Sequence, residues 1–186
     1  MKQILIFTTI LILSLSAFSQ SEKKVRKHNI QTKEVWLTDY ETGDDAYKKT
    51  EKIFNKDGKL IEEKKLDLQG NIEEFNSFKF NENGKLIEKL IINNKKKSAY
   101  SITYKYDANN KKIQESKFDK NKKLKSKVVY KYEDELLKKE LYYNSKKKLK
   151  KTIKYNYKNK LRISKTVLDA LGKKVEKIEY KYKFNN

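Results

Sequence analysis

Turn-like positions recur along this chain at two fixed offsets. One series steps by 26, 26, 25 and 25 residues through Gly58, Gly84, Asn110, Glu135 and Lys160. A second series takes the same steps between them, through Gly70, Lys96, Lys122, Lys147 and Gly172. Two independent series with one set of steps indicate an internal repeat. A period of this length is typical of chains built from stacked supersecondary units.

Aromatic residues mark the boundaries of the repeats. The period divides the chain into five units, 54–79, 80–105, 106–131, 132–156 and 157–181. Each unit begins with an aromatic residue and has another two residues before the next unit starts. This aromatic ladder comprises Phe54, Phe78, Phe80, Tyr104, Tyr106, Tyr130, Tyr132, Tyr155, Tyr157 and Tyr180. Apolar residues at alternate positions indicate strands with one buried face, so the ladder is predicted to be structural.

Each unit is predicted to be a strand, a turn, a second strand and a second turn. Short turns make successive strands antiparallel neighbours. The predicted fold is therefore all-β, an antiparallel meander of tandem 25–26-residue β-hairpin repeats with roughly ten to twelve strands that forms a curved or spiralling sheet. Five hairpin repeats span 54–182, a divergent capping hairpin spans 30–53, and 183–186 form a C-terminal tail. Residues 20–29 are polar and are expected to be loose.

Residues 1–19 have the pattern of a secretory signal peptide. Lys2 is followed by an apolar stretch from Ile4 to Leu15, and the small residues Ala17 and Ser19 suit cleavage before Gln20. A retained membrane anchor is the alternative, but spanning a bilayer takes about 20 apolar residues. We expect an exported protein in the periplasm, on the outer cell surface or secreted. The chain has no cysteine, so its stability cannot come from disulfides.

The formal net charge is +21, and only Arg26 and Arg162 among the 46 basic residues are arginine. Lysines attract anions with little geometric specificity, whereas arginine suits fixed bidentate contacts. A lysine recurs between the paired aromatics, on the face opposite the rings. This predicted row comprises Lys79, Lys105, Lys131 and Lys181, with Asn156 in the fourth unit. A solvated face that discourages edge aggregation and an anion-binding stripe are both open interpretations.

The repeat core resembles that of bacterial YD (RHS-type) repeats, Tyr-x-Tyr-Asp-x-x-Gly. The match is closest in residues 104–110, which read Tyr-Lys-Tyr-Asp-Ala-Asn-Asn, and residues 78–84 are a version with Phe in place of Tyr. The resemblance covers about 54–182, although three units lack the turn glycine. It implies a surface or secreted β-structure that in some members binds glycans or encloses a toxin.

No pattern in the sequence favours catalysis, a metal ion or a cofactor. His28 is the only histidine and lies outside the repeats, where it lacks the rigid neighbours that a catalytic histidine needs. Four early acids could in principle hold calcium, but their spacing matches no known loop: Asp39, Glu41, Asp44 and Asp45. An acidic hairpin turn is the simpler interpretation. A pair of carboxylates for glycoside hydrolysis would be assembled only in three dimensions.

Two classes of function are compatible with these features. The first is a non-catalytic cell-envelope or secreted protein that binds an unknown protein or an anionic polymer (glycan, lipopolysaccharide or nucleic acid) through its repeat surface. The second, which the family resemblance suggests, is an accessory or immunity-like protein of a secreted toxin system.

Overall fold

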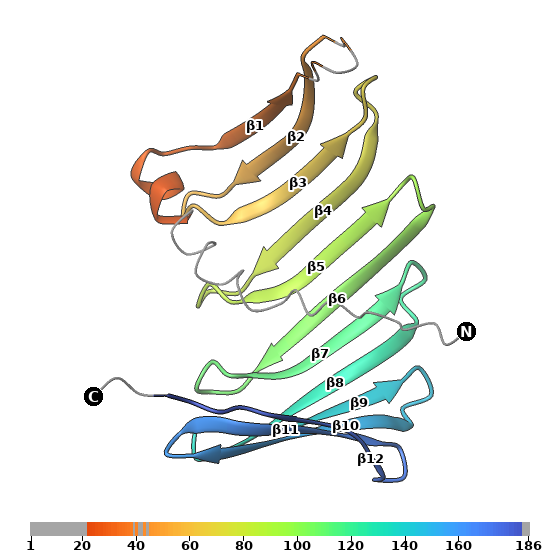
Figure 1. Ribbon diagram of the computed structural model, residues 1–186. Helices are drawn as coiled ribbons and strands as arrows, with labels where there is room; N and C mark the ends of the chain where they lie inside the picture. The colour runs from red at the N-terminus through yellow and green to blue at the C-terminus, as the bar shows by residue number, and fades with distance from the viewer. Residues whose placement is uncertain (1–21, 39, 41–42, 44, 184–186) are drawn as a thin grey trace. The chain divides into compact units, whose positions relative to one another are not determined.

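A computed structural model describes residues 22–38, 40, 43 and 45–183. Twelve strands follow one another in chain order, each antiparallel to its neighbours (Figure 1). The prediction of an all-β hairpin-repeat meander is thus confirmed. The predicted signal peptide and most of the candidate calcium acids lie outside the described residues. The strands are β1 (Thr32–Leu37), β2 (Tyr47–Phe54), β3 (Leu60–Leu66), β4 (Ile72–Phe80), β5 (Leu86–Asn93), β6 (Ser98–Tyr106), β7 (Lys112–Asp119), β8 (Leu124–Glu133), β9 (Leu136–Asn144), β10 (Leu149–Lys158), β11 (Leu161–Asp169) and β12 (Lys174–Glu179).

The chain divides into two compact units, Met1–Phe75 and Asn76–Asn186, with the boundary inside β4. The first unit contains β1 to β3, and β1 and β2 form the hairpin expected within 30–53. The second unit contains β5 to β12. Within the second unit the strand direction turns progressively from β6 to β12, so this part of the sheet is curved (Figure 1).

Most of the hairpin loops share one design. Each opens with an Asn or Asp whose side-chain Oδ1 accepts a hydrogen bond from the backbone N–H four residues later. Asp119, for example, accepts from the N–H groups of Asn121 and Lys123, both at 3.0 Å. The loops of this design begin at Asn55, Asp67, Asn81, Asp107, Asp119, Asn144 and Asp169. A side chain that satisfies the loop backbone in this way explains why Asx residues recur at the repeat period.

The fourth residue of each such loop has a left-handed backbone, with φ between +59° and +85°. These residues are Gly58, Gly70, Gly84, Asn110, Lys122, Lys147 and Gly172. They belong to the two series that define the period in the sequence. The loop between β5 and β6 differs, because its left-handed residue is Lys97 (φ 46°) and not Lys96. The period in the sequence therefore reflects the recurrence of a left-handed backbone conformation. Glycine adopts this conformation without the steric cost that lysine incurs.

A change of turn type shortens the repeat from 26 to 25 residues. The loops after β8 and β10 have two residues each, Asp134–Glu135 and Asn159–Lys160, and all four have positive φ. Two consecutive left-handed residues form a type I′ turn, which matches the twist of a two-residue hairpin. The Asx-initiated loop in the preceding unit places three residues, 108–110, between the hydrogen-bonded ends Asp107 and Lys111. One residue fewer in the loop is one residue fewer in the repeat.

The second aromatic of each pair ties neighbouring repeats together through its hydroxyl. In each case the tyrosine donates to the backbone carbonyl 20 residues earlier, at 2.6–3.0 Å. The pairs are Tyr106 with Leu86, Tyr132 with Lys112, Tyr157 with Leu137, and Tyr182 with Arg162. A phenylalanine fills the same space but leaves that carbonyl without its partner, which explains why Tyr predominates at this position.

The best-buried part of the second unit lies on β10 and β11. Ile153, Tyr155 and Val167 are 5–7% exposed and form a cluster on which Tyr142 and Tyr157 also pack. The other ladder rings are partly buried. This core is narrow, as expected for a sheet whose apolar residues are mainly large rings.

Residues 20–29 were expected to be loose, and for the described part this expectation was wrong. Residues 22–27 form a short helix, and Val25 is only 6% exposed. The helix backbone packs against the turn at Gly58, where an added Cβ would lie 2.6 Å from the Glu22 carbonyl oxygen and 3.0 Å from the Arg26 nitrogen. Glycine at this turn thus makes room for a helix that the polar sequence does not predict.

Candidate anion-binding site

The four lysines of the predicted row are all exposed. Lys79, Lys105 and Lys131 lie on β4, β6 and β8, and each is flanked in sequence by ladder aromatics. Because side chains alternate across a strand, these lysines point away from the face that carries the rings. Lys181 lies two residues beyond the end of β12 and is also exposed. We refer to the sheet surface opposite the rings in the second unit as the lysine face.

The cross-strand neighbours of these lysines differ. Lys79 forms an ion pair with Glu88 on β5, with the Lys79 Nζ 3.1 Å from Glu88 Oε2. Lys105 lies opposite Gln114 on β7, an uncharged neighbour. The predicted row is therefore not a uniform stripe, because its first member is neutralised within the protein.

Lys131 has a different environment. It lies directly opposite Lys139 on β9, and Lys139 in turn lies directly opposite Lys154 on β10. All three are exposed, and none makes an ion pair with another residue that the structure describes. We call these three residues the lysine triad. Directly opposed side chains have Cβ atoms about 5 Å apart, and like charges at this distance destabilise a sheet.

Few acidic side chains accompany the triad on its own face. On β8 the alternation places Glu133 on this face, two residues beyond Lys131, and Glu133 is exposed. Glu140, adjacent to Lys139 in sequence, points to the opposite face, where it accepts a hydrogen bond from Tyr155 Oη at 2.8 Å. The positive charge of the triad is therefore left largely uncompensated by the described part of the protein.

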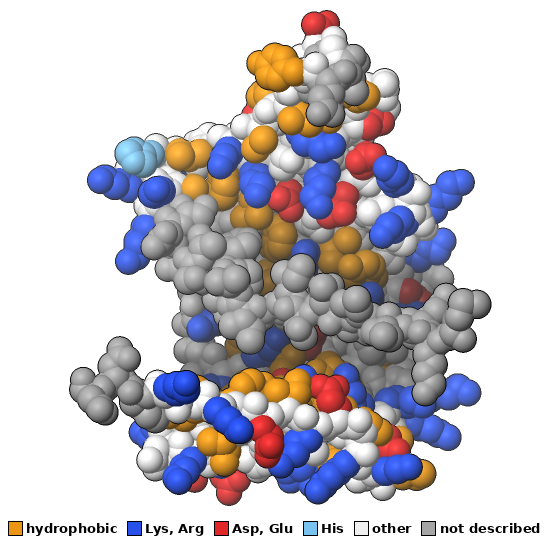
Figure 2. All heavy atoms as spheres, in the orientation of Figure 1, with side chains coloured by type: hydrophobic (Ala, Val, Ile, Leu, Met, Phe, Trp, Pro, Cys, Tyr) orange, Lys and Arg blue, Asp and Glu red, His pale blue; other side chains and the backbone are white. Residues whose placement is uncertain are grey.

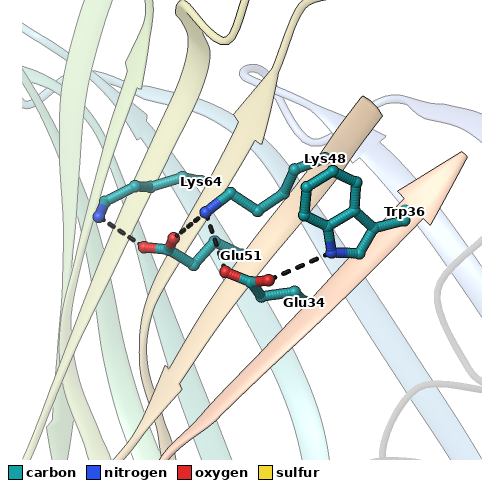
Figure 3. Close-up of polar contacts among 5 residues, drawn as sticks. All are labelled: Glu34, Trp36, Lys48, Glu51 and Lys64. Carbon is teal, nitrogen blue, oxygen red and sulfur yellow. Dashed lines mark hydrogen bonds and ion pairs between the residues drawn. The ribbon is translucent and has the colours of Figure 1, made fainter. Parts of the chain in front are cut away.

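The first unit also contains two like charges on adjacent strands, but there a lysine of the same sheet bridges them (Figure 3). Glu34 on β1 lies directly opposite Glu51 on β2, also a like-charge pair. Lys48 bridges them, with its Nζ 2.9 Å from Glu34 Oε1 and 2.8 Å from Glu51 Oε2. Lys64 on β3 contacts the other oxygen of Glu51 at 2.8 Å, and the Trp36 indole N–H donates to Glu34 at 3.2 Å.

The charged groups of this network shift one another's pKa. Hydrogen bonds from Lys48 and then Lys64 lower the pKa of Glu51 to about 2. The same contact with Lys48, followed by the Trp36 indole, lowers the pKa of Glu34, and Glu51 raises the pKa of Lys48. For the Glu34–Glu51 pair of the first unit, the fold thus supplies a counter-charge between the two like charges.

The rings on the opposite face are engaged with neighbours from their own sheet. The guanidinium of Arg162 lies 4.2 Å from the Tyr155 ring centre, and Lys112 Nζ lies 4.6 Å from that of Tyr130. Lys112 also pairs with Glu115, which accepts a hydrogen bond from the Tyr130 hydroxyl at 3.3 Å. Burial raises the pKa of Tyr104 to about 12, and burial raises the pKa of Tyr130 as well. These rings therefore contribute to packing within the sheet.

Charge is widely distributed over the molecule. Figure 2 shows basic side chains scattered over the visible face of both units, with acidic and hydrophobic side chains among them. A positive surface alone consequently does not locate a binding site here. Among the described residues there is no cluster of three or more metal-ligating side chains and no helix long and apolar enough to cross a membrane. His28 is exposed.

Sequence reasoning found Lys131 but missed Lys139 and Lys154. Their alignment depends on the irregularities between Lys131 and Tyr132 in the β8–β9 pairing and between Leu149 and Lys151 in the β9–β10 pairing. A bulge changes which residues face one another without leaving a clear mark in composition. The shortened repeat at Asp134–Glu135 was the signal available in the sequence. It indicates a two-residue type I′ turn, which brings the ends of β8 and β9 together.

No protein-family model matches this chain, and no curated protein matches it. Among solved structures, it is similar to a porin-like protein from Bacteroides uniformis, with 12% sequence identity and a TM-score of 0.38. The match covers 73% of this chain and 52% of that structure, so the chain spans about half of its length.

Proposed function

We propose that this chain is a non-catalytic exported repeat protein that binds an anionic polymer through its lysine face. The observation that carries the proposal is the state of the lysines between the paired tyrosines. Lys105, Lys131 and Lys181 are exposed, and none is ion-paired with a residue that the structure describes. The region 95–160 holds 23 lysines and 7 acids, a formal charge of +16.

The chemistry of this surface suits a polymer better than a small molecule. Lysine ammonium groups on flexible stems give a diffuse field with little geometric selectivity. Several such groups acting together bind a polyanion largely by releasing its counterions. The aromatic rings lie on the opposite face and contact their own sheet, so base or sugar stacking would contribute little on the lysine face. We therefore expect binding that depends on charge density and is blind to sequence.

Export forms part of the proposal and is supported by the apolar N-terminal stretch. N-terminal sequencing of exported protein is expected to begin at Gln20. Material that retains Met1 and Lys2 outside the inner membrane would contradict cleavage.

Salt titration of binding to heparin and to duplex DNA tests the function. We expect affinity to fall steeply as salt rises. Two variants with the same net charge then separate an organised face from a merely basic protein. In one variant the predicted row is reversed to glutamate; in the other, four exposed loop lysines are reversed, namely Lys56, Lys96, Lys120 and Lys146. Greater loss in the row variant supports the proposal, and no binding at low salt by the unaltered protein would overturn it.

A further inference from the structure

The lysine triad has the surroundings of a binding site for a single oxyanion. Lys131, Lys139 and Lys154 occupy three adjacent strands in direct cross-strand register. At a strand spacing of about 4.8 Å, the outer two lysines are separated by about 10 Å at the backbone. Lysine side chains are long enough for their ammonium groups to converge from that separation on an anion above Lys139.

The first unit shows how this fold holds a carboxylate between two lysines. Each oxygen of Glu51 contacts a different ammonium group, Lys48 and Lys64, at 2.8 Å in both cases. Glu51 and Lys64 are direct cross-strand partners, as Lys139 and Lys154 are. In the first unit Lys48 lies on the same strand as Glu51, three residues before it, and Lys64 lies on the next strand. The triad instead provides lysines from three adjacent strands and no carboxylate among them.

From this contrast we infer that the lysine triad binds one carboxylate, sulfate or phosphate group of an external ligand, which takes the role that the Glu51 carboxylate has in the first unit. This inference rests on the proposed function and specifies its central contact. Polar uncharged residues lie beside the triad on the same face, which suits a ligand that carries further oxygen atoms around its charged group. Asn156 Nδ2, for example, donates to Ser164 Oγ at 2.9 Å next to Lys154.

The proposed site predicts two separate effects of a single substitution, Lys139→Glu. This change places a carboxylate between Lys131 and Lys154, as Glu51 lies between lysines in the first unit. It should relieve the like-charge repulsion and therefore raise the melting temperature. It should at the same time fill the site from within and weaken anion binding. Because the chain has a net charge of +21, any Lys→Glu change shifts stability and polyanion binding in these two directions to some extent. The size of both effects relative to a matched control therefore tests the site.

The matched control is Lys120→Glu, which changes net charge equally on an exposed loop. Binding is measured by calorimetry at low salt with three probes: inorganic pyrophosphate, a heparin hexasaccharide and a short DNA duplex. We expect Lys139→Glu to weaken binding of the hexasaccharide about tenfold more than Lys120→Glu does, because a close counter-charge competes for both remaining lysines. Lys139→Gln, which removes one charge without adding another, should fall between them.

The three probes also identify the source of the oxyanion. Tighter binding of pyrophosphate and DNA indicates phosphate, and tighter binding of the hexasaccharide indicates sulfate or carboxylate. Equal effects of Lys139→Glu and Lys120→Glu on both binding and melting temperature would overturn the site while leaving the proposed function intact. Absence of polymer binding by the unaltered protein would instead overturn the proposed function.

Discussion

At the residue scale, this repeat is defined by backbone conformation more than by side-chain identity. The same left-handed position holds glycine in four of the Asx-initiated loops and Asn or Lys in the other three. A lysine with φ near +60° brings its Cβ close to the following carbonyl oxygen. These loops therefore contain a local strain that the rest of the repeat tolerates, and the strain can be measured.

Replacing Lys122 or Lys147 by glycine should stabilise the protein. Each residue has φ of about +60°. Glycine removes a left-handed steric penalty of about 1–2 kcal/mol. This gain exceeds the cost of about 0.5–1 kcal/mol that arises because glycine loses more conformational entropy on folding. The expected net gain is about 0.5–1 kcal/mol per site in the free energy of unfolding, measured by denaturant titration. Lys120→Gly, in the same loop without positive φ, is the control and should be neutral or destabilising. Equal effects at 120 and 122 would contradict the conformational explanation.

The charge network of β1 to β3 predicts a dependence on pH. The folded-state pKa of Glu51 is about 2, below its ordinary 4.5. A depressed pKa means that the contribution to stability is fully present above pH 4.5 and is lost as pH falls toward 2. We expect Glu51→Gln to cost at most about 1 kcal/mol at pH 7, since the pairs are near the surface. That difference from the unaltered protein should shrink between pH 4.5 and 3. A difference that stayed constant down to pH 3 would contradict this account of the charge network.

At the scale of elements, sequence reasoning was most successful where local chemistry decides the structure. Turns can be predicted because an Asx side chain and a left-handed residue act within five positions of one another. The hairpins followed from those turns and from alternating rings. The helix at 22–27 was missed because its stability depends on a distant contact, the packing of Glu22 and Arg26 against Gly58. The triad was missed for a similar reason, since bulges set the register.

The contact between the helix and the β2–β3 turn can be tested by comparing two glycines. Gly58 and Gly70 have nearly the same φ, 76° and 79°, so alanine should incur the same left-handed penalty at both. An added Cβ meets nothing within 4 Å at Gly70 but meets the helix backbone at Gly58. We therefore expect Gly70→Ala to cost about 1–2 kcal/mol and Gly58→Ala to cost more. Gly58→Ala should also expose Val25, which faster amide exchange in 22–27 would report. Equal costs without that exchange would show that the helix does not depend on Gly58.

At the scale of the whole molecule, an array of repeats should not be uniformly stable. In a repeat protein, stability is approximately the sum of unit terms and nearest-neighbour terms. Burial in the second unit is concentrated in β10 and β11, whereas all six residues of β12 are exposed. The repeated sequence predicts equivalent units, but it does not show that neighbouring strands cover β10 and β11 more fully than they cover β12.

Hydrogen exchange should therefore vary strongly across the second unit. Amides of β10 and β11 are expected to exchange slowest and those of β12 fastest, because local opening is easiest where few apolar contacts are lost.

A pair of isoleucine substitutions tests whether burial causes this difference in exchange. Ile153 is 5% exposed and Ile178 is 38% exposed, so Ile153→Ala should cost about 2–5 kcal/mol, whereas Ile178→Ala should cost much less. Ile153→Ala should also accelerate exchange in both β10 and β11, because Ile153 packs against Val167. Uniform exchange from β6 to β12, or equal costs at the two isoleucines, would mean that the repeats share stability evenly and that burial in β10 and β11 does not govern it.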